Sequence, residues 1–166
     1  MNASQADVKI TGVEANPMVK IAYNNLTINS QLIGIYNANN INAAITIGNY
    51  FKVSDELIKE AIENYIPENN RSQLILKNGN EIILDAYNAN PSSMKSALES
   101  FLMMEGAQKV VILGAMKELG TETDKEHAAL VQMVTNATEL EQIILVRKNI
   151  SMIIPKAERS VKMMMI

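Results

Sequence analysis

The sequence predicts an α/β protein in which a Rossmann-like domain with a mainly parallel sheet follows a smaller unit. Beyond about residue 70, short apolar runs alternate with segments whose apolar residues recur every three or four positions, which gives the order β-α-β-α-β. Strands joined by helices form a parallel sheet with right-handed crossovers. Before residue 67, short β segments come first and two helices follow. We therefore expect two parts, residues 1–70 and 71–166.

The first part begins with β structure. Lys20–Tyr23 and Leu26–Ile28 flank Asn24-Asn25, a pair suited to a hairpin turn. A helix is predicted from Asn37, where these residues recur at helical spacing: Ile41, Ala44, Ile45, Gly48 and Phe51. Ser54 is a good N-cap for a second helix, whose predicted apolar face is Leu57, Ile58, Ala61, Ile62 and Tyr65. The segment 67–70 then breaks the chain, and we place the domain boundary there.

The second part alternates strands and helices. The predicted strands are 73–76, 81–86, 109–113 and 141–146, and Asn78-Gly79 forms the turn between the first two. The helix that begins at Pro91 carries one apolar stripe, made of Met94, Ala97, Leu98, Phe101 and Leu102. Residues 123–126 match a capping box that opens a helix through about residue 137. Residues 147–166 are irregular, and an internal deletion and simple divergence both explain them.

Composition narrows the class of protein. Hydrophobic residues make up 48% of the chain, which is enough for a core, although aromatic residues make up only 4%. The formal net charge is −3 without a basic cluster, so we expect neither nucleic acid nor an anionic membrane as partner. The chain contains no cysteine, which excludes disulfides and thiolate metal sites. Neither a signal peptide nor a membrane span is visible, so the expected compartment is the cytoplasm.

The most informative segment is 84–94, Leu-Asp-Ala-Tyr-Asn-Ala-Asn-Pro-Ser-Ser-Met. An apolar strand leads into it, and Asn90-Pro91 at its end is an N-cap followed by a proline at the first helical position. A polar turn between a strand and a helix lies at the carboxyl end of the strand, where α/β sheets bind ligands. The helix that follows offers free N–H groups and a positive dipole end to an anion.

This segment resembles the DxYNANPxSM signature of the Mur ligase family, most closely the members that add D-alanyl-D-alanine to UDP-N-acetylmuramoyl-tripeptide. Three further segments match the family in the expected order: 34–44, 69–73 and 112–120. They are similar to the G-x-[HY]-N-x-x-N-x-x-A-A element that ends the central ATPase domain, to the region of the interdomain arginine, and to the [VI]LG-D-M-x-ELG turn. The resemblance covers roughly residues 32–146. It implies that residues 1–70 are the remnant of the ATPase domain.

The resemblance implies a set of nucleotide-binding residues: Asn37, Asn40, Arg71, Asp85, Tyr87 and Asn88. The two amides, of Asn37 and Asn40, suit an adenine edge. The Arg71 guanidinium on the linker suits ribose or phosphate oxygens, and the Asp85 carboxylate at a strand end suits ribose hydroxyls. Each residue also has an ordinary structural interpretation. Asparagines commonly cap helix starts, a linker arginine is usually solvated, Asp85 can cap the turn with Asn88, and Tyr87 can simply cover the sheet edge.

The resemblance also implies a substrate-binding set: Asn90, Ser93, Glu118, His127 and Lys156. Glu118 lies on the loop after the third strand, where the amine substrate should approach. His127 is the only histidine, and a single histidine in a helix is more often a packing or surface residue. Ala115 stands where the family usually has aspartate, so any role of that carboxylate is lost. Neither catalytic nor metal-binding residues are expected in this chain.

The implied activity is ATP- and Mg²⁺-dependent amide formation between UDP-N-acetylmuramoyl-tripeptide and D-alanyl-D-alanine. The family's phosphate loop, G-T-x-G-K-[ST], does not occur in the 166 residues, so we expect the chain alone to be inactive. A non-catalytic nucleotide-binding module and a degenerate relic of a Mur ligase remain alternatives. We also expect that the first part exposes an apolar surface that favours self-association.

Overall fold

The computed structural model describes residues 8–68, 70–106, 108–146 and 162–166. By its internal contacts the chain divides into two compact units, Met1–Pro67 and Glu68–Ile166. Each unit is described by itself.

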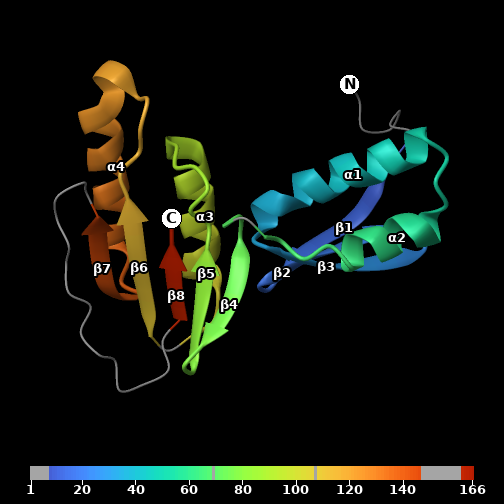
Figure 1. The fold of residues 1–166 in the computed structure, drawn as a ribbon, viewed down its shortest axis with the longest axis horizontal. Coiled ribbons are helices and arrows are strands. Elements are labelled where there is room, and N and C mark those ends of the chain that lie inside the picture. The colour runs from blue at the N-terminus through green and yellow to red at the C-terminus, as the bar shows by residue number, and fades with distance from the viewer. Residues whose placement is uncertain (1–7, 69, 107, 147–161) are drawn as a thin grey trace. The chain divides into compact units, whose positions relative to one another are not determined.

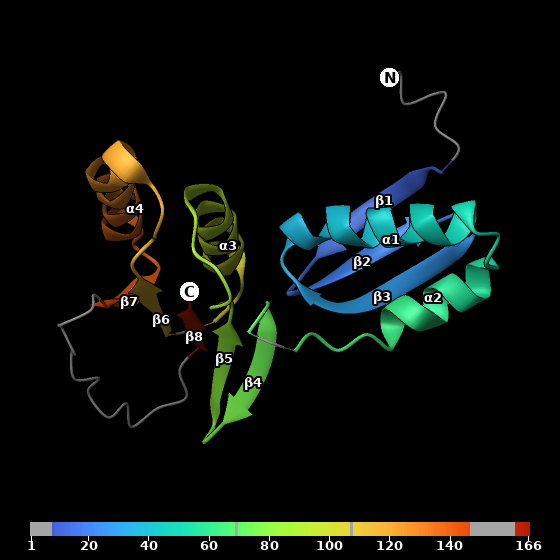
Figure 2. The same cartoon turned by 45° about the horizontal axis from the view of Figure 1, so that its top comes forward.

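The first unit is a three-stranded antiparallel sheet with two helices on one face (Figures 1 and 2). Its elements are β1 (Ile10–Ala15), β2 (Met18–Tyr23), β3 (Leu26–Ile33), the 3₁₀ turn η2 (Ile35–Asn37), α1 (Ala38–Tyr50) and α2 (Asp55–Glu63). The predicted hairpin at Asn24-Asn25 is confirmed, because Tyr23 pairs with Leu26. Asn24 adopts φ 51°, a left-handed conformation that asparagine tolerates in tight turns.

The core of this unit lies between the sheet and the two helices. Its buried residues are Val19, Ile21, Tyr23, Ile28, Ile41, Ile45 and Ile58. The N-cap of α2 is confirmed, since Ser54 accepts a hydrogen bond from the Leu57 N–H. The predicted apolar face of α2 is partly wrong: Ile58 is buried, but Leu57 and Tyr65 are more than half exposed. Only a narrow stripe of α2 meets the sheet, so the flanking apolar residues remain on the surface.

The second unit is built on a five-stranded sheet in the order β4-β5-β8-β6-β7. Its strands are β4 (Gln73–Lys77), β5 (Asn80–Leu84), β6 (Lys109–Gly114), β7 (Leu140–Val146) and β8 (Lys162–Met165). β4 is antiparallel to β5, and all other neighbours are parallel, as the arrows in Figure 1 show. The predicted mainly parallel α/β domain is therefore confirmed.

The central strand is the element that the sequence did not reveal. β8 pairs with β5 on one side and with β6 on the other, although it comes from the irregular last residues of the chain. It has only four residues, three of them methionines, and methionine has no marked preference for strands. Its place in the sheet is set by pairing with strands that precede it by about 50 to 80 residues. A local pattern cannot indicate such pairing.

Helices α3 (Pro91–Met103) and α4 (Thr123–Asn136) connect the parallel strands and contact each other. The predicted stripe of α3 is confirmed at Met94, Ala97, Leu98 and Phe101, which are buried. The predicted capping box at 123–126 is wrong. A 3₁₀ turn, η3 (Gly120–Glu122), leads into α4, so Thr123 is already its first residue, and the Thr123 hydroxyl donates to the Gly120 carbonyl.

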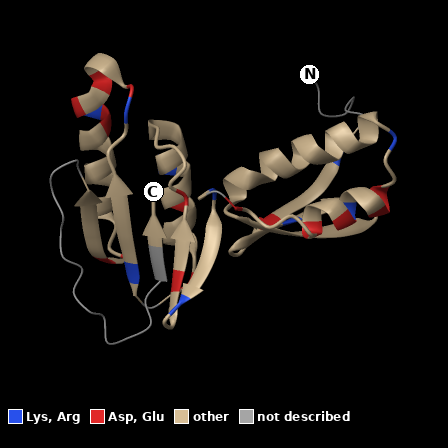
Figure 3. Cartoon of the chain, viewed as in Figure 1, with Lys and Arg blue, Asp and Glu red and all other residues tan. Residues whose placement is uncertain are grey.

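Two surface properties bear on function. Lys and Arg lie distributed over both units with acidic residues among them, in the part of the chain that Figure 3 colours. None of the helices in the described ranges combines the length and hydropathy that crossing a bilayer requires.

Candidate functional site

The predicted residues of the second unit gather at the carboxyl edge of its sheet. Asp85 directly follows β5, and the loop that carries Glu118 follows β6. The end of β8 joins these two loops: the Asp85 N–H donates to the Met165 carbonyl at 2.8 Å, and the Gly114 N–H donates to the Ile166 carbonyl oxygen at 2.7 Å. The expectation that both loops leave the same edge is therefore confirmed. Parallel α/β sheets bind ligands at this edge.

Asp85 interacts with a residue that the sequence did not single out. Its two carboxylate oxygens accept hydrogen bonds from the Ser72 backbone N–H at 3.2 Å and from the Ser72 hydroxyl at 3.5 Å. Ser72 is buried and adopts φ 47°, so its strained backbone is tied directly to the strand end. Nothing in the sequence marks Ser72 except its position beside Arg71. The contact fixes the start of β4 against the end of β5.

Arg71 and Tyr87 form the second pair at this edge. The Arg71 guanidinium carbon lies 3.7 Å from the centroid of the Tyr87 ring, a cation–π contact. Tyr87 is 62% exposed, so the pair is accessible to a ligand. Arg71, Asp85 and Tyr87 thus lie within one short stretch of surface, as a cation, a carboxylate and an aromatic ring. Asn88, which follows Tyr87 in the same loop, is exposed.

Asn90 and Ser93 cap helix α3. The Asn90 side-chain oxygen accepts from the Ser93 N–H at 2.9 Å and from the Ser92 hydroxyl at 2.8 Å. In return, the Asn90 N–H donates to the Ser93 hydroxyl at 3.3 Å, which completes a reciprocal capping box with Pro91 at the first helical position. These two residues, predicted as substrate contacts, therefore also have a structural role. Because α3 follows the Asp85 loop, the cap fixes where that loop ends.

Glu118 and His127 are linked through the loop after β6. Glu118 is exposed and adopts φ 63°, a left-handed conformation that is uncommon for glutamate. His127, on the first turns of α4, accepts a hydrogen bond from the Met116 N–H at its Nε2 atom, at 3.0 Å. Its Nδ1 atom lies 2.7 Å from the Thr123 carbonyl. Ala115 is exposed beside them.

The two predicted adenine contacts lie in the first unit and differ in exposure. Asn37 is buried, and its amide nitrogen donates to the Ile33 carbonyl at 2.7 Å. The Asn37 side-chain oxygen accepts from the Asn40 amide at 2.9 Å, while Asn40 itself is exposed. Both residues remain predicted nucleotide contacts, and their side chains lie in different environments. Asn37 orients Asn40, and Asn40 presents the accessible amide.

Two further predictions concern a lysine and a metal. Lys156 lies outside the described residues. In the ranges that the structure describes, no group of three or more His, Asp or Glu side chains is arranged to bind a metal ion.

The two groups with shifted pKa values belong to the first unit. The pKa of Glu63 is lowered, mainly by the hydrogen bond from the Asn29 backbone N–H and next by Lys59. The pKa of Tyr23 is raised, mainly by burial and next by its hydrogen bond to Asp55. Neither group is among the predicted site residues.

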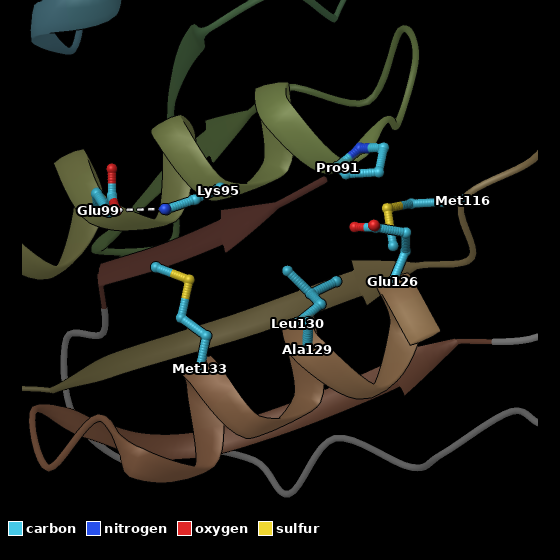
Figure 4. A pocket seen from close by; sticks show the side chains of 8 residues that line it. All are labelled: Pro91, Lys95, Glu99, Met116, Glu126, Ala129, Leu130 and Met133. Atoms are coloured by element: carbon cyan, nitrogen blue, oxygen red, sulfur yellow. Dashed lines mark ion pairs between the residues drawn. The ribbon is translucent and has the colours of Figure 1, made fainter. Parts of the chain in front are cut away.

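A shallow pocket of about 320 Å³ lies between α3 and α4 (Figure 4). It is lined by Pro91, Lys95, Glu99, Met116, Glu126, Ala129, Leu130 and Met133. Lys95 and Glu99 form a 3.8 Å ion pair across one turn of α3. None of the predicted site residues that the structure describes is among these lining residues, so the pocket is separate from the Arg71–Asp85–Tyr87 group.

Comparison with known families gives one match over most of the second unit. A family model described as "Mur ligase, glutamate ligase domain" matches residues 70–163, more than half of the chain. Several curated relatives bear the name UDP-N-acetylmuramoyl-tripeptide--D-alanyl-D-alanine ligase, among them the three that follow. The Bacillus subtilis protein is 38% identical over 54% of this chain and 20% of its own length. The Treponema pallidum protein is 32% identical over 65% of this chain and 23% of its own length. The Borreliella burgdorferi protein is 30% identical over 71% of this chain and 31% of its own length.

Solved structures agree with the sequence relatives. A crystal structure of MurF from Acinetobacter baumannii matches with a TM-score of 0.78 and 27% identity, covering 87% of this chain and 32% of the other. MurF from Thermotoga maritima, solved in complex with ADP, matches with a TM-score of 0.69 over 96% of this chain and 42% of the other. At 17% identity, this likeness shows a shared fold and nothing further. The chain spans between a fifth and a third of the length of the curated relatives described above.

Proposed function

The chain belongs to the Mur ligase family, and we propose that it is the C-terminal part of a ligase that adds D-alanyl-D-alanine to UDP-N-acetylmuramoyl-tripeptide in peptidoglycan precursor synthesis. The observation that carries the proposal is the carboxyl edge of the second sheet. There Arg71, Asp85 and Tyr87 lie at the same edge of the sheet as the loop that carries Glu118, with β8 between β5 and β6. The names of the relatives support the choice of substrate.

The chemistry of the three residues fits one half of a nucleotide site. The Tyr87 ring offers a face to a base, Asp85 accepts hydrogen bonds from ribose hydroxyls, and Arg71 binds ribose or phosphate oxygens. Asp85 is already oriented by Ser72, and the Arg71 guanidinium already lies against Tyr87. Orientation before binding reduces the entropy lost when a ligand binds. Asn40, whose amide is exposed in the first unit, is proposed as a nucleotide contact of that unit by itself.

ATP supplies the phosphoryl group that activates the carboxylate of the tripeptide, and the amine of D-alanyl-D-alanine then displaces phosphate to form the amide. The residues of this chain bind and orient, because such chemistry depends on positioning and charge neutralisation more than on a side-chain nucleophile. Among the described residues, no three His, Asp or Glu side chains are grouped to bind a cation such as Mg²⁺. Closure of this C-terminal part over the nucleotide would exclude water from the activated carboxylate.

The remaining parts of the proposal concern partners and compartment. We place the protein in the cytoplasm, with small-molecule substrates and without nucleic acid or membrane as partner. The first unit exposes several large apolar side chains: Ile47, Tyr50, Phe51 and Leu57. The exposure of these large apolar side chains supports the expectation that the chain self-associates.

Nucleotide titration tests the proposal. With ADP or ATP we expect chemical-shift changes at the amides of Arg71, Asp85 and Tyr87 and a dissociation constant of about 1 mM, since half a site supplies only about 4 kcal/mol. Arg71→Ala should weaken binding further. Lys77→Ala is the matched control, because Lys77 is exposed at the opposite end of the hairpin. Shifts confined to other surfaces, or micromolar affinity that Arg71→Ala leaves unchanged, would contradict the half-site.

A further inference from the structure

The loop after β6 has a strained backbone at the position where the amine substrate is proposed to approach. Glu118 adopts φ 63°, and two residues later Gly120 adopts φ 55°. Left-handed backbone at a residue other than glycine costs on the order of 1 kcal/mol and persists only where the surroundings fix it. The feature that fixes this loop is therefore of functional interest.

Two contacts at Met116 anchor the loop. The Met116 side chain is 4% exposed, and the Met116 N–H donates to Nε2 of His127 at 3.0 Å. His127 stands on α4, so this bond ties the loop to the helix that follows it. The Thr123 hydroxyl donates to the Gly120 carbonyl at 2.7 Å and fixes the turn between them.

The partners of His127 determine its tautomer. A backbone N–H can only donate, so Nε2 must be the unprotonated acceptor of the Met116 bond. A backbone carbonyl can only accept, so Nδ1 must carry the proton that bonds to Thr123, at 2.7 Å. These two bonds together require the tautomer that carries its proton on Nδ1. Both ring nitrogens are engaged, and neither is left for a substrate.

We propose that His127 is a positioning residue which, through its Nε2 atom, holds the Met116 amide and thereby fixes Glu118 at the carboxyl edge of the sheet. This differs from the substrate contact that the resemblance implies, because a substrate would have to displace an existing hydrogen bond. The role of Glu118 toward an amine rests on the proposed function. The link from His127 to Met116 does not depend on it.

Three substitutions separate the two ring nitrogens. Gln places a side-chain oxygen near the Nε2 position, Asn places its polar atoms near Nδ1, and Phe keeps the ring without either. Hydrogen exchange of the Met116 amide should accelerate roughly five- to tenfold in His127→Phe and His127→Asn, the effect of one lost hydrogen bond. His127→Gln should restore most of the protection. Gln132→Phe, an exposed position on the same helix, is the control and should leave Met116 unchanged.

A measurement on the unsubstituted chain keeps the test independent of how the variants fold. The ¹⁵N spectrum of the single imidazole should show Nδ1 as the nitrogen that carries the proton and Nε2 as the acceptor. A ring protonated at Nε2, or unchanged Met116 exchange in His127→Phe, would overturn the proposal. Nucleotide shifts at Arg71 and Tyr87 should survive His127→Phe, so failure of the nucleotide site and failure of the positioning role give different results.

Discussion

At the scale of single residues, Lys109 shows how a charge is accommodated in the second unit. It is 4% exposed at the start of β6, yet its ammonium donates to the Leu102 carbonyl and lies 5.9 Å from the centroid of the Phe101 ring. Leu102 is in the last turn of α3, where backbone carbonyls lack partners within the helix. Lys109 therefore closes the C-terminal end of α3 from the neighbouring strand.

We predict that Lys109→Met destabilises the second unit by about 1–2 kcal/mol, because the Leu102 carbonyl loses its donor while the methionine fills the same volume. Urea unfolding monitored by hydrogen exchange of the β6 amides measures the change in unfolding free energy. Lys117→Met is the control, because Lys117 is exposed. Equal or higher stability in Lys109→Met would mean that desolvation of the ammonium outweighs its bonds.

At the scale of elements, the capping box of α3 makes Asn90 testable as a structural residue. Its side chain accepts from the Ser93 N–H, a role that serine or aspartate can fill equally well. We predict that Asn90→Ala lowers the unfolding free energy by about 1 kcal/mol, while Asn90→Asp stays near the original value. Thermal unfolding of both variants measures this. If both variants kept full stability, the cap would be dispensable and Asn90 would serve only a ligand.

The contact between α2 and β3 predicts a pH dependence in the first unit. Glu63 accepts a hydrogen bond from the Asn29 N–H at 2.8 Å and pairs with Lys59, and these partners lower its pKa below the ordinary value of 4.5. A lowered pKa in the folded state means that the carboxylate contributes stability above the pKa of the unfolded chain. That contribution is lost as the pH falls from about 4.5 through the lower pKa of the folded state.

We therefore predict that β3 amides exchange faster at pH 3.5 than at pH 7 relative to their intrinsic rates, by an amount on the order of 1 kcal/mol. Glu63→Gln should remove most of this difference, because a neutral amide does not titrate. Glu60→Gln, an exposed position on the same helix, should keep it. Identical pH profiles for the original chain and Glu63→Gln would contradict the assignment.

At the scale of the whole molecule, the sequence predicted what local patterns determine. The hairpin at Asn24-Asn25, the cap at Ser54 and the apolar stripe of α3 each depend on residues that lie close together in the sequence. β8 could not be predicted, because its place between β5 and β6 depends on pairing across the sheet. The same reason applies to the site. Asp85 was identified, but its partner Ser72 and the Met116–His127 bond join residues 13 and 11 positions apart.

The last prediction concerns activity. The chain contains no G-T-x-G-K-[ST] loop, whose backbone amides and lysine would bind the phosphates of ATP. Arg71 is a single cation against Tyr87, and one cation cannot both bind the phosphates and neutralise the charge that develops in phosphoryl transfer. We therefore predict no ATP hydrolysis and no amide formation by the purified chain with ATP, Mg²⁺ and both substrates.

Phosphate release measures this, with a full-length relative such as the Bacillus subtilis ligase as the positive control. Release above background that Arg71→Ala abolishes would show that this chain carries a phosphate site of its own. The proposal that this chain supplies only half of the nucleotide site of a larger enzyme would then fail. Background release together with millimolar nucleotide binding at Arg71 and Tyr87 is the result expected of a half-site, because binding a base and ribose requires none of the phosphate contacts that the chemical step needs.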